Sequence, residues 1–435
     1  MKTKKHLSFT SMRIRLSSFF QAIVDCRQPA KITHSLHDVL MSAFACMYFQ
    51  DPSLLQFQKR MQEELHRNNL QTLFGVTNIP KDSQMRELVD EVDRENFRPI
   101  FNNYYLRMQR GKHLQEFELF PGLYLVPMDG TEYFSSEKVH CEQCLRKEHK
   151  EGEITYSHQA LQGGIMHPDQ SVVIPLMPEE ICNTDGETKQ DCELKAGKRF
   201  IEKTRQDHPQ LGIIFGGDGL FSRQPIIEDI LEKRAHYLFV AKPLDHKYLM
   251  EWIAAYPKLN ETQFTDEKGR LHHYEWMNAV PLNGREDSIQ VNFFQCKITQ
   301  GEKIVYRNSW VTDLVITQVN IKTMVRAGRC RWKVENECFN VMKNHGYYLD
   351  HNYGHGKNNL CFNFYLLTLL AFFFHQIFEA TDQLYQASRK KFGSKKHMWE
   401  TLRAYIKIII FNTWEDLLNF ALTPTRYNLA VAQAP

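Results

Sequence analysis

Residues 123–133, Leu-Tyr-Leu-Val-Pro-Met-Asp-Gly-Thr-Glu-Tyr, are the stretch that decides how this chain folds. The apolar run from Leu123 to Met128 predicts a buried strand, and Asp129-Gly130 predicts a glycine turn at its end. Residues 211–220, Leu-Gly-Ile-Ile-Phe-Gly-Gly-Asp-Gly-Leu, repeat the arrangement and place Asp218 behind a second apolar run. Two acidic residues at the ends of two buried strands are candidates for one site.

A third acidic residue, Glu335, lies in a segment of helical period, Arg-Cys-Arg-Trp-Lys-Val-Glu-Asn-Glu at residues 329–337. Carboxylates at two strand ends and on a nearby helix can converge although they are far apart in sequence. Three hard oxygen ligands with open positions suit a pair of Mg²⁺ or Mn²⁺ ions that clamp an in-line phosphoryl displacement. Glu337 is the competing third ligand, but on a helix its side chain lies about 200° from that of Glu335, so both cannot face one site.

Length and composition indicate a folded, multidomain protein. The chain has 435 residues, of which 43% are hydrophobic and 24% charged, so two or three domains are expected. The net charge is only +3, but basic residues cluster at 1–24, 322–343 and 389–396. Such clusters attract polyanions, or are solvated faces. Ten cysteines without a short secreted framework, and an N-terminus without signal-peptide features, indicate the reducing cytoplasm.

One segment has the length of a membrane span. Residues 360–378 contain no Asp, Glu, Lys or Arg, and their number meets the threshold for a transmembrane helix. The segment also contains Asn363, Thr368, His375 and Gln376. We therefore predict a buried core helix and no membrane partner, with a membrane anchor as the alternative.

The order of the predicted elements indicates an α/β fold class. Residues 155–166 and 172–177 predict a hairpin, 191–207 and 225–234 predict helices, and 237–241 predicts a further strand. Three strands, helix, strand, helix, strand is the order of a ribonuclease-H-like catalytic core. The predicted regions are a helical DNA-end-binding domain (1–115), a first part of the core (120–242), a β-rich insertion (243–312), a second part of the core with the third acidic residue (313–380), and a basic C-terminal helical region (381–435).

These residues resemble the DDE transposases of insertion sequences, especially the insertion-sequence-four group, over roughly residues 120–380. The resemblance rests on Asp129-Gly-Thr-Glu-Tyr, Asp218-Gly-Leu, the β-rich insertion and Arg331-Trp-Lys-Val-Glu335. It implies two Mg²⁺ ions held by Asp129, Asp218 and Glu335, and cut-and-paste movement of a DNA element from its inverted ends.

The signature of this group around the third acid is Tyr, two residues, Arg, three residues, Glu, six residues, Lys. Arg331 and Glu335 keep their spacing, but Gly328 stands at the Tyr position and Lys343 follows Glu335 after seven residues. The roles of Arg and Glu therefore carry over, the Tyr is missing, and the role of Lys343 is open.

Several side chains are candidates for contact with double-stranded DNA, both at the element ends and at the target. Arg331, one helical turn before Glu335, would hold a phosphate, with Lys333 and Lys343 nearby. Trp310 could stack on an unpaired base or belong to the core. Pairing of two ends predicts a homodimer on DNA. The alternative functions are a ribonuclease-H-like structure-specific DNA nuclease and a domesticated, non-catalytic DNA-binding regulator.

A second constellation follows the first strand. Cys141-Glu-Gln-Cys144 is a Cys-x2-Cys pair, with His149 and His158 soon after it. Two thiols and two imidazoles are a ligand set for tetrahedral Zn²⁺. We predict that Cys141, Cys144, His149 and His158 hold a structural zinc ion beside the active site, the alternative being free thiols in a loop.

Overall fold

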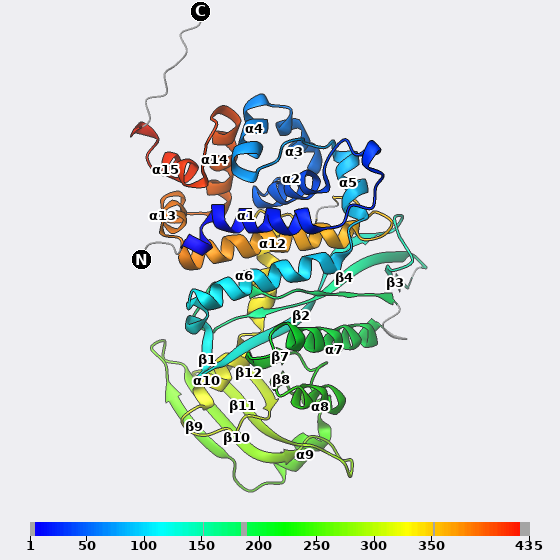
Figure 1. Ribbon diagram of the computed structural model, residues 1–435. Helices are drawn as coiled ribbons and strands as arrows, with labels where there is room; N and C mark the ends of the chain where they lie inside the picture. The colour runs from blue at the N-terminus through cyan, green and yellow to red at the C-terminus, as the bar shows by residue number, and fades with distance from the viewer. Residues whose placement is uncertain (1–4, 151, 184–188, 351–352, 427–435) are drawn as a thin grey trace, which may run out of the picture.

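A computed structural model describes residues 5–150, 152–183, 189–350 and 353–426. The first four and last nine residues of the predicted terminal regions lie outside the described residues. The molecule is mixed α/β, with a helical layer at one end, a mixed sheet in the middle and an antiparallel extension of that sheet at the other end (Figure 1).

Strands from the first part of the predicted core and from the predicted insertion join one sheet, in the order β3-β4-β2-β7-β8-β12-β11-β10-β9. The strands are β1 (Glu118–Phe120), β2 (Leu123–Ser136), β3 (Leu145–Glu148), β4 (Ile154–Ile165), β5 (Ile174–Pro175), β6 (Glu179–Ile181), β7 (Gly212–Gly217), β8 (His236–Val240), β9 (Asn260–Thr265), β10 (Leu271–Pro281), β11 (Gln290–Gln300) and β12 (Lys303–Thr312). β2, β7 and β8 are parallel neighbours, whereas β4 is antiparallel to β2 and β12 is antiparallel to β8. The predicted hairpin is confirmed, because Gly164 of β4 pairs with Pro175 of β5.

The predicted insertion is β-rich but does not form a sheet of its own. It begins with α9 (Lys247–Ala254), and its last strand, β12, pairs with β8 of the core. The two predicted helices of the core are also present, as α7 (Lys189–Asp207) and α8 (Gln224–Glu232).

β2 does not turn at Asp129, contrary to the glycine turn predicted there. It pairs with β7 up to Pro127 and with β4 from Met128 to Ser136, so the new partner extends the strand where the first one stops. Gly130 has a packing role instead. A Cβ at this position would lie 3.3 Å from the carboxyl group of Glu193 on α7, which packs on this face of the sheet.

The N-terminal and C-terminal helices share one hydrophobic core. The rings of Phe44 and Phe374 lie 5.0 Å apart, and the side-chain amide of Asn69 donates to the carbonyl oxygen of Ile406 at 2.8 Å. Residues 1–115 therefore do not form a helical module with a core of its own. The helices of this layer are α1 (Phe9–Ala22), α2 (Leu36–Tyr48), α3 (Leu54–Met61), α4 (Glu64–Asn69), α5 (Asp82–Asp90), α6 (Arg98–Arg110), α12 (Leu360–Thr381), α13 (Gln383–Phe392), α14 (Lys395–Ile408) and α15 (Trp414–Leu422).

α12 is the helix whose length and apolar composition suit a membrane span, the one such helix in the described part of the chain. Its most apolar stretch is 94% buried inside the protein, with α2, α5 and α13 against it. It is thus the core helix that the sequence favoured. Its N-terminus is held by Asp90 of α5, whose carboxylate accepts bonds from the backbone N–H groups of residues 357–360 at 2.8–3.0 Å.

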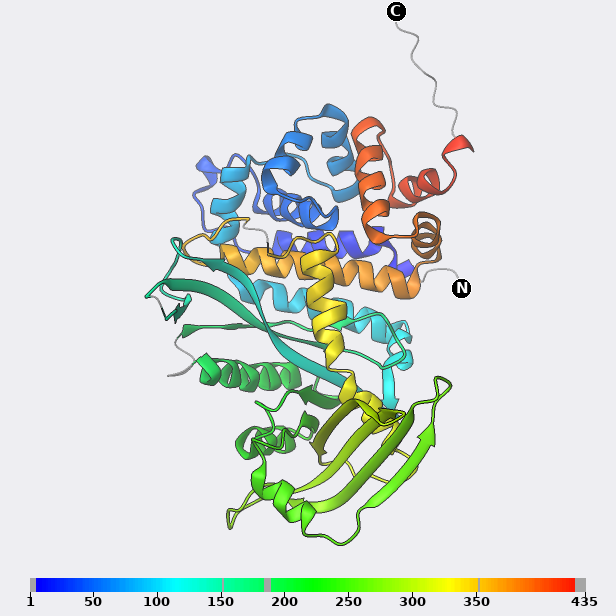
Figure 2. The ribbon, with the colours of Figure 1, turned by 180° about the vertical axis from the view of Figure 1, so that it is seen from behind.

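One segment connects the two ends of the molecule. It comprises α10 (Ile321–Arg329), the π-helix η7 (Val334–Phe339) and α11 (Asn340–Asn344). Figure 2 shows it in yellow, running from the antiparallel extension to α12 across the sheet, where η7 packs against β2 and β4. Short π-helical turns are often found at functional sites, and this one carries Glu335.

Candidate active site

Asp129 and Asp218 lie at the same level of the sheet. The last registered pair of the parallel β2–β7 ladder is Pro127 with Gly216, and each acid follows that pair by two residues. A step of two residues keeps the side chain on the same face of a strand. The register therefore brings together two carboxyl groups that are 89 residues apart in sequence.

The carboxyl group of Asp129 is partly buried among charges of both signs. Its Oδ2 accepts a bond from Nη1 of Arg331 at 2.5 Å, and its Oδ1 accepts the N–H of Gly130 at 3.1 Å. Burial raises the pKa of Asp129, Arg331 opposes this increase, and the negative charges of Asp218 and Glu335 add to it. A positive charge near Asp129 is therefore favourable.

Glu335 shares a groove with Asp129, whereas Glu337 does not. The groove has a volume of about 440 Å³ and lies between β2 and the η7–α11 segment. Glu335 is exposed within it, and Glu337 points elsewhere, with Oε1 at 3.7 Å from Nζ of Lys333. The geometry thus separates the two candidate third ligands as the helical register predicted.

Lys343 also lines this groove. Its Nζ donates to the carbonyl oxygen of Glu132 at 2.8 Å and lies 3.3 Å from Oδ1 of Asp350. Despite its shifted spacing in the sequence, Lys343 lines the same groove as Asp129 and Glu335. Asp218 has a basic neighbour of its own, because Nζ of Lys242 lies 3.6 Å from Oδ2 of Asp218.

The three acids do not form a tight cage. In the described part of the chain, the carboxylate oxygens of Asp129, Asp218 and Glu335 do not all lie within 4.8 Å of one another. Asp129 and Glu335 line the groove, and Asp218 acts on Asp129 through its charge.

Two of the predicted DNA contacts are core residues instead. Trp310 is completely buried and stacks on Phe294, with ring centroids 5.2 Å apart. Lys333 is 6% exposed, and its Nζ donates to the carbonyl oxygen of Gln170 at 2.5 Å. Neither side chain can meet DNA from these positions, because the β11–β12 ladder and the helix packing enclose them.

Burial of Trp310 also explains the glycine at the Tyr position of the signature. A Cβ at Gly328 would lie 2.6 Å from Nε1 and Cε2 of the indole. The space beside α10 that a larger side chain would need is occupied by Trp310, so glycine is required here.

A separate cluster of four side chains lies behind the strand that carries Asp129. The ligand atoms of Cys141, Cys144, His158 and His355 are all within 4.8 Å of one another. His149, predicted to belong to this group, is exposed and lies outside it, with Nε2 at 2.8 Å from Oγ1 of Thr155. No local spacing in the sequence points to His355, which lies in the glycine-rich run at residues 345–356.

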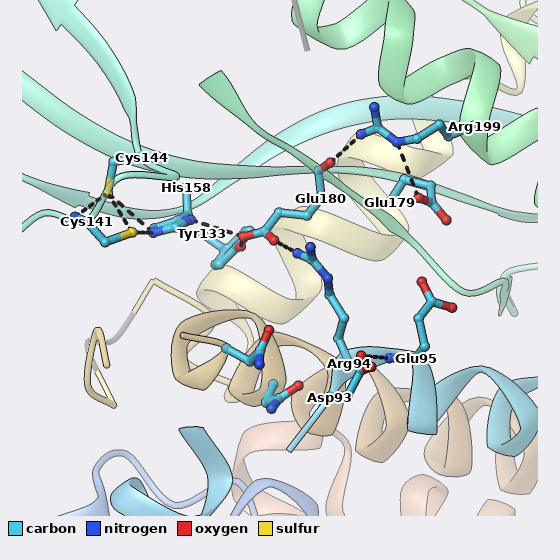
Figure 3. Close-up of polar contacts among 12 residues, drawn as sticks. Asp93, Arg94, Glu95, Tyr133, Cys141, Cys144, His158, Glu179, Glu180 and Arg199 are labelled. Carbon is cyan, nitrogen blue, oxygen red and sulfur yellow. Dashed lines mark hydrogen bonds and ion pairs between the residues drawn. The ribbon is translucent and has the colours of Figure 1, made fainter. Parts of the chain in front are cut away.

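Buried polar groups hold His158 in place. Figure 3 shows Cys141, Cys144 and His158 beside Glu180, whose Oε1 lies 3.1 Å from Nδ1 of His158 and accepts the hydroxyl of Tyr133 at 2.9 Å. Arg94 from the helical layer pairs with the other oxygen of Glu180. Burial lowers the pKa of His158 to about 4, so its ring is neutral at neutral pH.

In comparisons with known proteins, no family model and no curated protein sequence matches this chain.

Proposed function

We propose that this protein is a metal-dependent DNA strand-transfer enzyme of the DDE transposase kind, which cleaves DNA at element ends and joins those ends to target DNA. The observation that carries the proposal is the level placement of Asp129 and Asp218 at the end of the β2–β7 ladder, with Glu335 in the groove beside Asp129. The strand order β6-β4-β2-β7-β8, antiparallel and then parallel, supports it because this order is typical of ribonuclease-H-like cores.

The acidic array fits divalent cations. Its donors are hard carboxylate oxygens, and the raised pKa of Asp129 reflects burial and neighbouring negative charge. Two ions about 3.5–4 Å apart need a broader array than one ion does. When bound, Mg²⁺ or Mn²⁺ would lower the pKa of the attacking hydroxyl group and stabilise the leaving oxygen.

Arg331 has two roles in this proposal. Without divalent cations, its guanidinium neutralises Asp129 through the bond at 2.5 Å. Once a divalent cation takes over that charge, the guanidinium becomes available to a DNA phosphate in the same groove. Lys343, whose partners are a carbonyl oxygen and an exposed carboxylate, is the second phosphate contact.

The test is cleavage and joining of duplex DNA taken from either side of the gene, in Mg²⁺ or Mn²⁺. We expect Asp129→Asn, Asp218→Asn and Glu335→Gln each to lower the rate by about 10³-fold or more, as for groups that act as a unit. Glu337→Gln is the matched control and keeps its activity, because Glu337 lies outside the groove. Wild-type cleavage by Asp218→Asn would refute the assignment.

The same assay separates the other functions. A structure-specific nuclease would cut branched or looped DNA and give no joined product. A non-catalytic regulator would bind the flanking DNA without cutting it in either metal. A transposase gives joined product, and measurement of complex mass on DNA would show two chains per pair of ends.

A further inference from the structure

Four side chains outside the acidic groove are arranged as ligands of a single metal ion. We infer that Cys141, Cys144, His158 and His355 bind one structural Zn²⁺ ion, which joins the strand of the first acid to the chain that follows the third. The metal site is independent of the proposed function, and only the effect of the ion on Glu335 rests on the proposed function.

The distances match a tetrahedron. Zn–S bonds of about 2.3 Å and Zn–N bonds of about 2.0–2.1 Å require separations of about 3.8 Å between sulfurs, about 3.5 Å between sulfur and nitrogen and about 3.3 Å between nitrogens. The sulfurs of Cys141 and Cys144 are 3.8 Å apart. Nε2 of His158 lies 3.5 Å and 3.3 Å from these sulfurs, and Nε2 of His355 lies 3.4 Å from the sulfur of Cys144. The two Nε2 atoms are 3.2 Å apart.

Both imidazoles are oriented by their second nitrogen. Nδ1 of His158 faces the carboxylate of Glu180 at 3.1 Å, and Nδ1 of His355 faces the carbonyl oxygen of Gly356 at 2.8 Å. Metal-bound histidines characteristically donate this N–H to a carboxylate or a carbonyl oxygen, which leaves the Nε2 lone pair for the ion. Both Nε2 lone pairs therefore point into the same small space between the thiols.

The loop that carries His355 is built to hold it there. Gly354 and Gly356 on either side have φ of 130° and 72°, and a Cβ at Gly356 would lie 2.4 Å from Oδ1 of Asp90. Only glycine allows this path, and the carboxylate of Asp90 fixes the next four backbone N–H groups. These contacts restrict the position of His355.

Other chemistry suits the cluster less well. Cys144 beside His158 resembles a nucleophile with its base, but Cys144 is 3% exposed and has no access for a substrate. A two-iron cluster would separate the thiols from the imidazoles, whereas here they are in mutual contact. Two thiolates balance the charge of Zn²⁺, and four protein ligands leave no position for water, so the site is closed and structural.

The ion would link parts of the chain that are remote in sequence. Cys144 and His355 are separated by 211 residues. Cys141 and Cys144 follow β2, which carries Asp129, while His355 follows α11 and η7, which carry Lys343 and Glu335. Because η7 packs on β2, a bond between the continuations of both elements holds the third carboxylate in register with the first.

The test begins with elemental analysis of the full chain purified without chelator, where we expect one zinc ion per chain. Protein stripped of metal and titrated with Co²⁺ should show the intense visible absorption of a tetrahedral thiolate site at one equivalent. His355→Ala should lose both signals, whereas His149→Ala, the matched control, should keep them. Asp129→Asn should keep its zinc although it no longer cleaves DNA. Failure of the zinc site can therefore be distinguished from failure of the proposed DNA cleavage.

Three results would overturn the inference. Wild-type protein that gives no tetrahedral cobalt spectrum would exclude the site even if every variant failed to fold. Full zinc content in His355→Ala would exclude His355 as a ligand. Loss of zinc in His149→Ala would show that His149 is a ligand, as the sequence predicts. If the zinc site is real but DNA cleavage by chelator-stripped protein in added Mg²⁺ is undiminished, the link to Glu335 is wrong.

Discussion

Replacing Asp90 by alanine should destabilise the helical layer, because one carboxylate holds the chain that enters α12 and the first N–H of that helix. Asp90 is 7% exposed and accepts four backbone bonds from residues 357–360. Lys357 and Asn358 are exposed, so water can replace the carboxylate there, whereas Leu360 is buried. A buried N–H left without a partner costs about 1–3 kcal/mol, and losing a negative charge at a helix N-terminus costs about 1 kcal/mol.

Together these losses predict that Asp90→Ala lowers the free energy of unfolding by about 2–4 kcal/mol. Urea unfolding followed by tryptophan fluorescence measures this change, since Trp399 and Trp414 are buried in the same layer. The free energy of unfolding of Asp90→Asn should fall between those of Asp90→Ala and the wild type, because an amide oxygen still accepts hydrogen bonds but carries no charge.

Glu91→Ala is the control for this prediction. Glu91 is the next residue and is exposed, and the only described contact of its side chain is with the side chain of Asn358 at 3.4 Å, so its replacement should change stability by less than about 0.5 kcal/mol. Equal stability of Asp90→Ala and Glu91→Ala would refute the reasoning. Because the capped loop carries His355, Asp90→Ala should also release zinc faster to a colorimetric chelator.

Three further predictions address the groove, the core and the pH dependence of stability. Arg331→Ala should lower the Mg²⁺ concentration at half-maximal cleavage, since the guanidinium no longer competes for the first carboxylate, and should reduce the maximal rate; an unchanged metal dependence would contradict its ion-pair role. Gly328→Ala should destabilise the protein by about 1–3 kcal/mol, because the new methyl group overlaps the indole of Trp310. Thermal unfolding measures this loss of stability. Gly269→Ala is the control, because a Cβ there meets open space and only the positive φ of the backbone is strained. The bond to Asp313 raises the pKa of His236 from its ordinary value of 6.5. The stabilisation from this pair is therefore complete below pH 6.5 and disappears as the pH rises through the folded-state pKa, so wild type and His236→Gln should differ in stability at pH 5.5 and converge at alkaline pH.

The sequence by itself determined the elements whose signals are local. Short apolar runs predicted β2, β7 and β8, and the segments between them predicted the helices α7 and α8. Residues two apart in a strand, or three to four apart in a helix, share a face, so their pattern records which side is buried. For the same reason the positions of Asp218 and Glu335 relative to their own elements could be predicted, as could the divergence of the Glu335 and Glu337 side chains.

Only the tertiary structure decided which distant segments meet. His355 joins Cys144 across 211 residues, and no spacing in the sequence encodes that approach. β2 continues past Asp129 because β4 offers it a second ladder, and a strand's length depends on its partners as well as on its own residues. The sequence left open whether Trp310 contacts DNA or belongs to the core, and it placed Lys333 among the DNA contacts, yet packing buries both. Local pattern reports the preference of a segment for water or for an interior, while the identity of its neighbours follows from how the whole chain closes around its core.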